Sequence, residues 1–297
     1  MPAPSAVLEL LKPITWFAPI WAFACGAVSS AAFPGGLLED GRWLALLGGL
    51  ALAGPLVCGT SQAVNDWFDR HVDAINEPDR PVPSGRIPGR WGLYIGVLWT
   101  TLSLLVAAAL GPWVLAAAAF GLTLAWLYSA PPLRLKRNGW WGNSAVAICY
   151  EGLPWLTGAL VVASVLPGWK VTGVAVLYSL GAHGIMTLND FKSVDGDTRM
   201  GLRSLPVQLG VERAAQLACA VMAIPQMVVI GLLWNWGLPG YASIIGVLLI
   251  TQFLLMGRLL DDPHGRAPWY NATGTSLYVL GMLVAALALR SLPVATA

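Results

Sequence analysis

The sequence has little charge. Only 11% of its 297 residues are Asp, Glu, Lys or Arg, whereas soluble domains carry about 25%. Hydrophobic residues make up 57% of the chain, which excludes an ordinary soluble domain and predicts a protein that crosses a membrane several times. The formal net charge of +2 gives no indication of nucleic-acid binding.

Cysteine is scarce as well. The four cysteines stand singly in apolar stretches and form no C-x-x-C pair. This spacing argues against a disulfide framework or a zinc site and is typical of small buried side chains. They are Cys25, Cys58, Cys149 and Cys219. Residues 1–12 also lack the basic start, apolar core and cleavage site of a signal peptide, so we expect the first apolar span to be retained.

Uncharged runs long enough for a spanning helix, which needs about 20 residues, recur along the chain. Two runs, 91–133 and 214–257, are too long for one helix, and Gly and Pro residues near 111–112 and 235–240 divide each in two. The resulting nine spans lie at 14–33, 43–64, 91–133 (two), 141–163, 171–189, 214–257 (two) and 272–289. The predicted fold is an all-α integral membrane protein, a single domain over 1–297 built as a bundle of nine transmembrane helices.

Basic residues are divided unevenly between the two ends of these spans. All but three of the 17 Lys and Arg residues fall on the side of the N-terminus, and the exceptions are Arg42, Lys170 and Arg290. The positive-inside rule therefore places the N-terminus and the charged loops in the cytoplasm and the C-terminus on the other side.

Charge is concentrated in residues 65–86, directly after the second span. On a helix Asn65, Asp69 and Asp73 recur every four residues and share a face, with Asp66 beside them. Carboxylates at this spacing repel one another, and a divalent cation removes the conflict. Because magnesium prefers carboxylate oxygens shared with phosphates, these four residues are predicted metal ligands. The alternative is a solvated loop of alternating charges.

A second Asn-Asp pair ends the sixth span, in residues 189–199. Asp190 is followed there by Asp195 and Asp197. Because the two acidic motifs follow spans two and six, each half of the bundle presents one, which is a weak internal repeat. Two rows facing a cavity on the cytoplasmic side would form a cage for two metal ions. The alternative is a flexible charged loop.

The fourth span ends in Y-S-A-P-P-L-R-L-K-R, residues 128–137. Its two prolines stop the helix, and Arg134, Lys136 and Arg137 follow within four residues. These cations suit a positive-inside anchor and also a clamp for an anionic headgroup, and the two roles are compatible.

These motifs together carry a resemblance. N-D-x-x-D-x-x-x-D, R-P-V-P-S-G-R, Y-S-A-P-P-L-R-L-K-R and the second acidic motif resemble the UbiA superfamily of intramembrane prenyltransferases. Within it, L-K-P-I-T-W-F-A-P, N-E-P-D-R-P-V-P-S-G-R and N-D-F-K-S-V-D-G-D resemble the chlorophyll and bacteriochlorophyll synthases. Many relatives carry D-x-x-x-D as the second acidic pair, so the spacing here leaves open which two of Asp190, Asp195 and Asp197 hold metal.

The resemblance implies a magnesium-dependent enzyme. It would transfer a geranylgeranyl or phytyl group from its diphosphate to the propionate carboxylate of chlorophyllide or bacteriochlorophyllide and release diphosphate. Metal ions stabilise the departing diphosphate as Lewis acids, and fixed cations add to that effect.

The candidate site residues fall into three sets. The implied metal ligands are Asn65, Asp66, Asp69, Asp73, Asp190, Asp195 and Asp197. The candidates for diphosphate binding are Arg70, Arg80, Arg86, Tyr128, Arg134, Lys136, Arg137, Lys192 and Arg199. The residues expected to act most directly in catalysis are Asp69, Asp73, Asp190, Arg70 and Lys136.

Two isolated polar residues inside predicted spans are candidates for tetrapyrrole binding. Glu151 is the only charge of the fifth span, and an intramembrane carboxylate is functional by default, with helix packing as the alternative. His183 lies seven residues before Asp190 on the same helix face. It would meet the tetrapyrrole or its central magnesium, or else form an interhelical hydrogen bond.

Two other functions stay open. One is a prenyltransferase of the same fold acting on a quinone precursor or on heme. The other is a membrane transporter, although the carboxylates cluster at cytoplasmic helix ends and not at mid-membrane. The resemblance implies membrane lipid as a partner and a bacterial inner or intracytoplasmic membrane as the location, and it leaves protein partners open.

Overall fold

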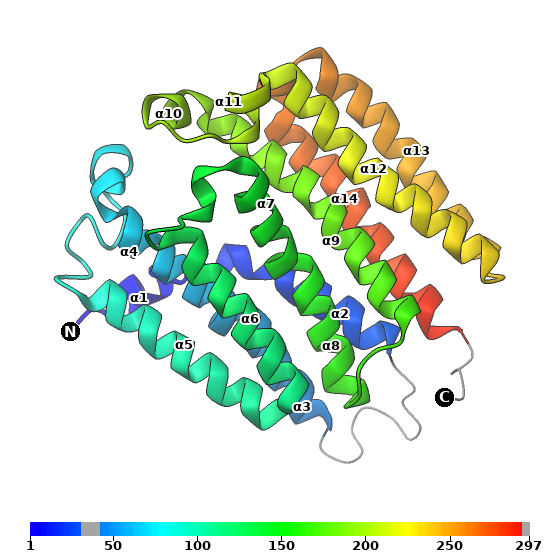
Figure 1. Ribbon diagram of the computed structural model, residues 1–297, viewed down its shortest axis with the longest axis horizontal. Coiled ribbons are helices and arrows are strands. Elements are labelled where there is room, and N and C mark those ends of the chain that lie inside the picture. Colours follow the sequence, from blue (N-terminus) through cyan, green and yellow to red (C-terminus); the bar gives the residue numbers. More distant parts are fainter. Residues whose placement is uncertain (31–41, 293–297) are drawn as a thin grey trace. The chain divides into compact units, whose positions relative to one another are not determined.

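The computed structural model describes residues 1–30 and 42–292, and within them the chain is all-α (Figure 1). Among these residues the β-type pairing is one isolated bridge between Asn138 and Arg203. The predicted all-α fold class is therefore confirmed. The predicted end of the first span, at residue 33, lies outside the described residues.

The helices have the following bounds. In chain order they are α1 (Pro4–Leu10), α2 (Phe17–Ser29), α3 (Arg42–Ala51), α4 (Gly59–Asn76), α5 (Trp91–Leu110), α6 (Pro112–Ser129), α7 (Gly139–Ala147), α8 (Leu153–Ala163), α9 (Trp169–Asn189), α10 (Val194–Arg199), α11 (Leu205–Leu209), α12 (Val211–Asn235), α13 (Pro239–Asp261) and α14 (Pro263–Arg290). Short 3-10 segments are η1 (Pro13–Trp16), η4 (Leu135–Arg137) and η6 (Asp190–Ser193), and π-helical segments are η3 (Leu52–Cys58) and η5 (Ile148–Gly152).

Eight helical stretches in the described residues are long and apolar enough to cross a membrane. A ninth arises if the pair Pro4–Leu10 and Pro13–Ser29, bent by 43°, counts as one span. The predicted breaks after 110 and 235 are confirmed, because proline begins both α6 and α13. The second predicted span, 43–64, continues as one helical stretch to Asn76, so the first acidic motif extends a membrane helix.

Two of the spanning stretches widen locally into π-helix. In η3 the cause is Pro55, which has no backbone N–H to donate and whose ring crowds the preceding turn. The Pro55 carbonyl accepts a hydrogen bond of 3.1 Å from the Trp99 indole of α5. The second π segment, η5, contains Glu151. Hydropathy alone predicted neither bulge.

The chain divides into two compact units. The first comprises the described parts of Met1–Ala27, Phe33–Arg134 and Leu153–Leu166. In it α4, α5 and α6 pack against one another, and α8 packs against α3 and α6. The second comprises the described parts of Val28–Ala32, Leu135–Gly152 and Pro167–Ala297. The predicted single domain over 1–297 stays a prediction.

Helices α2 and α8 of the first unit cross with their backbones almost in contact. A Cβ atom built on Gly158 would lie 2.0 Å from the Phe23 carbonyl oxygen, and one on Gly26 would lie 1.8 Å from the Trp155 carbonyl oxygen. Only glycine fits at such a crossing, as at the small-residue interfaces of other membrane helices.

In the second unit α9 packs against α7, α12 and α14, and α13 packs against α12 and α14 (Figure 1). Gln226 of α12 and Gln252 of α13 are fully buried and exchange two side-chain hydrogen bonds, of 3.1 and 3.0 Å. Tyr278 of α14 donates a hydrogen bond of 2.6 Å to the Tyr178 carbonyl of α9. Buried polar pairs therefore fix how these apolar helices pack.

The crossing of α2 and α8 gives a first prediction. Gly158→Ala should lower the free energy of unfolding by roughly 1–3 kcal/mol, because the added methyl group meets backbone that cannot move aside. Gly231→Ala in α12 is the matched control, since its Cβ meets open space. Thermal unfolding of the purified protein in detergent measures both. Equal stability of the two variants would contradict the tight crossing.

Candidate functional site

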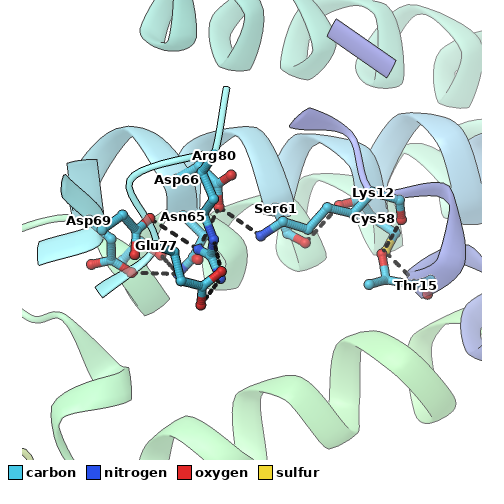
Figure 2. Close-up of polar contacts among 11 residues, drawn as sticks. Lys12, Thr15, Cys58, Ser61, Asn65, Asp66, Asp69, Glu77 and Arg80 are labelled. Carbon is cyan, nitrogen blue, oxygen red and sulfur yellow. Dashed lines mark hydrogen bonds and ion pairs between the residues drawn. The ribbon is translucent and has the colours of Figure 1, made fainter. Parts of the chain in front are cut away.

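The carboxylate row of the first acidic motif lies on α4, and the rest of the motif, after Asn76, lies in the following loop (Figure 2). Asn65, Asp66, Asp69 and Asp73 therefore share one helix, as their spacing predicted. Asp66 is fully buried and Asp73 is buried, whereas Asn65 and Asp69 are partly exposed. The row thus contains buried carboxylates, whose negative charge must be compensated by nearby positive charge.

Three cations supply that charge in the structure. Lys12 Nζ lies 2.7 Å from Asp66 Oδ1. Arg80 Nη1 lies 3.0 Å from Asp73 Oδ2 and 3.5 Å from Asp66 Oδ1. Arg134 Nη2 lies 3.0 Å from Asp69 Oδ1. The repulsion within the row, for which the sequence suggested a metal ion, is thus partly relieved by the chain itself.

Lys12 was not predicted as a site residue. It lies between α1 and η1 with a left-handed backbone, φ 47°, and the N–H and hydroxyl of Thr15 both donate to its carbonyl. From there its side chain extends along α4 to Asp66 (Figure 2). The L-K-P stretch contributed to the family resemblance, but no local pattern indicated that it returns to α4.

Arg80 comes from the loop after α4 and also pairs with Glu77. Burial alone would lower the pKa of Arg80, but the hydrogen bond to Glu77 and the charges of Asp66 and Asp73 outweigh it and raise that pKa. The guanidinium is therefore a permanent charge beside the row.

Asn65 links the row to α6. Its side-chain amide nitrogen donates to Asp69 Oδ2 at 3.2 Å and to Ser129 Oγ at 3.3 Å. Ser129 is buried at the end of α6 and was not among the predicted residues.

The donor set of α4 suits magnesium. Carboxylate and amide oxygens are the ligands that a hard divalent cation prefers. Asp66 Oδ2 is buried and has no hydrogen-bond partner in the described part of the chain. Among residues 1–30 and 42–292, no three Asp, Glu, His or Cys side chains already converge as a complete metal site. The predicted two-metal cage stays a prediction.

Two of the residues predicted to bind diphosphate, Arg70 and Arg86, contact groups outside the carboxylate row of α4. The Arg70 guanidinium lies 4.1 Å from the centre of the Trp67 ring and donates to the Trp67 carbonyl. Arg86 forms a bidentate pair with Glu9 of α1 and donates to the Asp79 carbonyl. Arg86 thus ties the loop after α4 to α1.

The second acidic motif lies in the second unit, where α9 gives way to η6 and α10. Asp190 Oδ2 accepts a hydrogen bond of 3.0 Å from the Asn143 amide of α7. Asp197 is buried, close enough to Asp190 for the two charges to interact, and its Oδ2 accepts from Ser193 Oγ at 3.3 Å. Asp195 is exposed. Among the three candidates, Asp190 and Asp197 are less exposed than Asp195, and the charge of Asp197 acts on Asp190.

The predicted cationic segment 128–137 is shared between the units. Tyr128 and Arg134 belong to the first unit, whereas Lys136 and Arg137 form part of η4 in the second. The Arg137 carbonyl accepts from the Arg203 N–H, and the Arg203 carbonyl accepts from the Gly139 N–H. This pairing holds η4 against the segment after α10. Lys192 and Arg199 have exposed side chains.

Both candidates for tetrapyrrole binding lie in the second unit. Glu151 is buried in the π segment η5, and its Oε2 atom has no hydrogen-bond partner within the described residues. His183 of α9 is buried with its ring 5.9 Å from the Trp140 ring of α7, tilted by 32°. Neither the burial of Glu151 nor the ring contact of His183 identifies a ligand for these residues.

Two solved structures share this fold. A digeranylgeranylglyceryl phosphate synthase structure aligns with a TM-score of 0.74 at 22% identity, covering 95% of this chain and 98% of that one. A UbiA homologue from Archaeoglobus fulgidus, bound to DMAPP and Mg2+, aligns with a TM-score of 0.73 at 19% identity, covering 96% and 99%.

Curated relatives are closer in sequence. The chain is 60% identical to the bacteriochlorophyll synthase 33 kDa chain of Cereibacter sphaeroides over 294 residues, covering 99% of this chain and 96% of that one. It is 39% identical to the chloroplastic chlorophyll synthase of Arabidopsis thaliana, covering 95% of this chain and 73% of that one. The model of the UbiA prenyltransferase family matches residues 17–277. The chain therefore belongs to the UbiA prenyltransferase family.

Proposed function

We propose that this protein transfers a geranylgeranyl or phytyl group from its diphosphate to the propionate carboxylate of bacteriochlorophyllide or chlorophyllide, releasing diphosphate. The observation that carries the proposal is the 60% identity to a bacteriochlorophyll synthase chain over almost the whole length of both proteins. The carboxylate row of α4 supplies oxygen ligands of the kind that magnesium prefers, and its three cations lie beside it, where positive charge favours a diphosphate.

Magnesium is the metal that these residues fit. Its proposed ligands are Asn65, Asp66, Asp69 and Asp73 of the first motif and Asp190 and Asp197 of the second. The buried Asp66 Oδ2 atom without a partner supports this assignment. Bound magnesium would act as a Lewis acid on the leaving diphosphate. A family member of the same fold is bound to DMAPP and Mg2+.

The cations of the first unit have a second role in this proposal. Lys12, Arg80 and Arg134 stand at the row in fixed positions, and preorganised positive charge stabilises a leaving diphosphate without reorganisation. The remaining candidates for contacts with the diphosphate are Tyr128, Lys136, Arg137, Lys192 and Arg199. The aromatic and acidic partners of Arg70 and Arg86 favour a structural role for these two residues.

The acceptor supplies its own nucleophile. A propionic acid has a pKa near that of Glu, about 4, so it is ionised at pH 7 and attacks an allylic carbon without a general base. Glu151 and His183 then contact the macrocycle and take no proton from the acceptor. A phenolic or alcohol acceptor would have to lose a proton, which is why a quinone precursor is the second choice.

The apolar helical stretches of the described residues make this an integral membrane protein. We propose the bacterial inner or intracytoplasmic membrane, with the acidic motifs on the cytoplasmic side, because the loops on their side of the predicted spans together hold 14 of the 17 Lys and Arg residues.

The acceptor proposal predicts a substrate pair. Purified protein given Mg2+ and geranylgeranyl diphosphate should convert bacteriochlorophyllide free acid to its prenyl ester, detected by mass spectrometry. The methyl ester of the same propionate should not react, because its oxygen carries no charge. Prenylation of 4-hydroxybenzoate or heme, with the chlorophyllides untouched, would reject the acceptor but leave the family intact.

The second motif predicts a difference between two neighbouring carboxylates. Asp197→Asn should lower kcat/KM by roughly 100-fold or more, since even the partners of metal ligands are worth about 10–100-fold. Asp195→Asn should stay near wild type, because Asp195 is exposed. The two variants differ in one carboxylate each and are assayed side by side. A larger loss from Asp195→Asn would overturn the assignment.

A further inference from the structure

Asn143 reaches from α7 to the end of α9, in the second unit. It is buried, with 6% of its surface exposed. Its side-chain nitrogen donates to Asp190 Oδ2 at 3.0 Å and to Thr187 Oγ1 at 3.4 Å. The two acceptors lie three residues apart, so one amide spans the last turn of α9.

The hydrogen bonds around Asn143 have a fixed direction. Thr187 is fully buried, and its hydroxyl donates to the His183 carbonyl at 2.9 Å. A hydroxyl carries one proton, so Thr187 accepts from Asn143 and cannot also donate to Asp190. Both hydrogens of the Asn143 amide are thereby committed, one to Thr187 and one to Asp190.

Asp190 needs an external anchor. It caps α9 at the change from α-helix to the 3-10 segment η6. At that position its side chain is not confined by a following α-helical turn. A neutral amide that donates to Oδ2 fixes the carboxylate plane without cancelling its charge. The carboxylates of α4, in contrast, are held by cations.

We propose that Asn143 is a positioning residue for the second acidic motif. It holds Asp190 Oδ2 and thereby orients the ionised carboxylate for a divalent cation that carries the prenyl diphosphate. The inference rests on the proposed function, because it takes Asp190 as a metal ligand. Asn143 itself touches neither metal nor substrate and acts through Asp190.

Replacing Asn143 should weaken metal binding more than it weakens the fold. Asn143→Leu keeps the branched shape of the side chain, at a larger volume, and removes the donor. Residues that hydrogen-bond to metal ligands are typically worth 10–100-fold in metal affinity, so the Kd should rise by about that factor. Gln252→Leu is the matched control, because it also removes a buried amide of this unit, at the α12–α13 contact.

The test measures metal binding directly. The full-length protein in detergent is titrated with Mn2+ in the presence of a non-reactive geranylgeranyl thiolodiphosphate, and free Mn2+ is followed by electron paramagnetic resonance. Asn143→Leu should raise the Kd about 10–100-fold, whereas Gln252→Leu should lower the unfolding temperature without changing the Kd. If Asn143→Leu fails to fold, Asn143→Ser replaces it, since serine is too short to reach Asp190.

The possible outcomes distinguish the positioning role of Asn143 from the metal-binding role of Asp190. An unchanged Kd in a folded Asn143 variant, with a raised Kd in Asp190→Asn, would overturn the positioning role alone. A Kd that Asp190→Asn leaves unchanged would overturn the metal role of Asp190 and this inference with it. An equal rise in Kd for Gln252→Leu would show a loss of general stability and would also overturn the inference.

Discussion

Burial of the Asp66 carboxylate is the constraint that shapes the first unit. An ion removed from water costs several kcal/mol unless a partner compensates it. Lys12 and Arg80, which lie on either side of α4 in the sequence, must therefore both reach that helix. The apolar contacts of α1 with Val82 and Ile87, and the pair of Arg86 with Glu9, hold both segments in place. The packing at this end of the unit therefore places two cations, Lys12 and Arg80, beside the Asp66 carboxylate.

The carboxylates of the two acidic motifs have different kinds of hydrogen-bond partners. On α4 the carboxylates are paired with cations, and a metal ion entering there competes with Lys12, Arg80 and Arg134 for the same oxygens. At the end of α9 the carboxylates are held by neutral donors, Asn143 and Ser193, which leave the negative charge in place. This difference follows from what each helix packs against.

Local pattern was enough to predict the helical row, because a spacing of four residues needs only one helix. The breaks at Pro112 and Pro239 were equally local. Lys12 and Asn143 could not be predicted, because they meet their carboxylates across 54 and 47 residues and only tertiary packing brings them there. The distinction between Asp195 and Asp197 depends on which side of a single short helix is buried. No spacing rule supplies that information.

A double-mutant cycle on Lys12 and Asp66 measures whether Lys12 balances the buried charge of Asp66. Unfolding is measured in detergent with divalent ions removed, and Lys192→Met is the control for loss of an exposed lysine. Lys12→Met should lower the free energy of unfolding by about 3 kcal/mol, because it leaves the buried carboxylate with only the longer contact to Arg80, at 3.5 Å. Adding Asp66→Asn should restore most of that loss, because the charge is gone. Losses that simply add in the double variant, or a Lys12→Met variant as stable as Lys192→Met, would show that Lys12 does not balance the Asp66 charge.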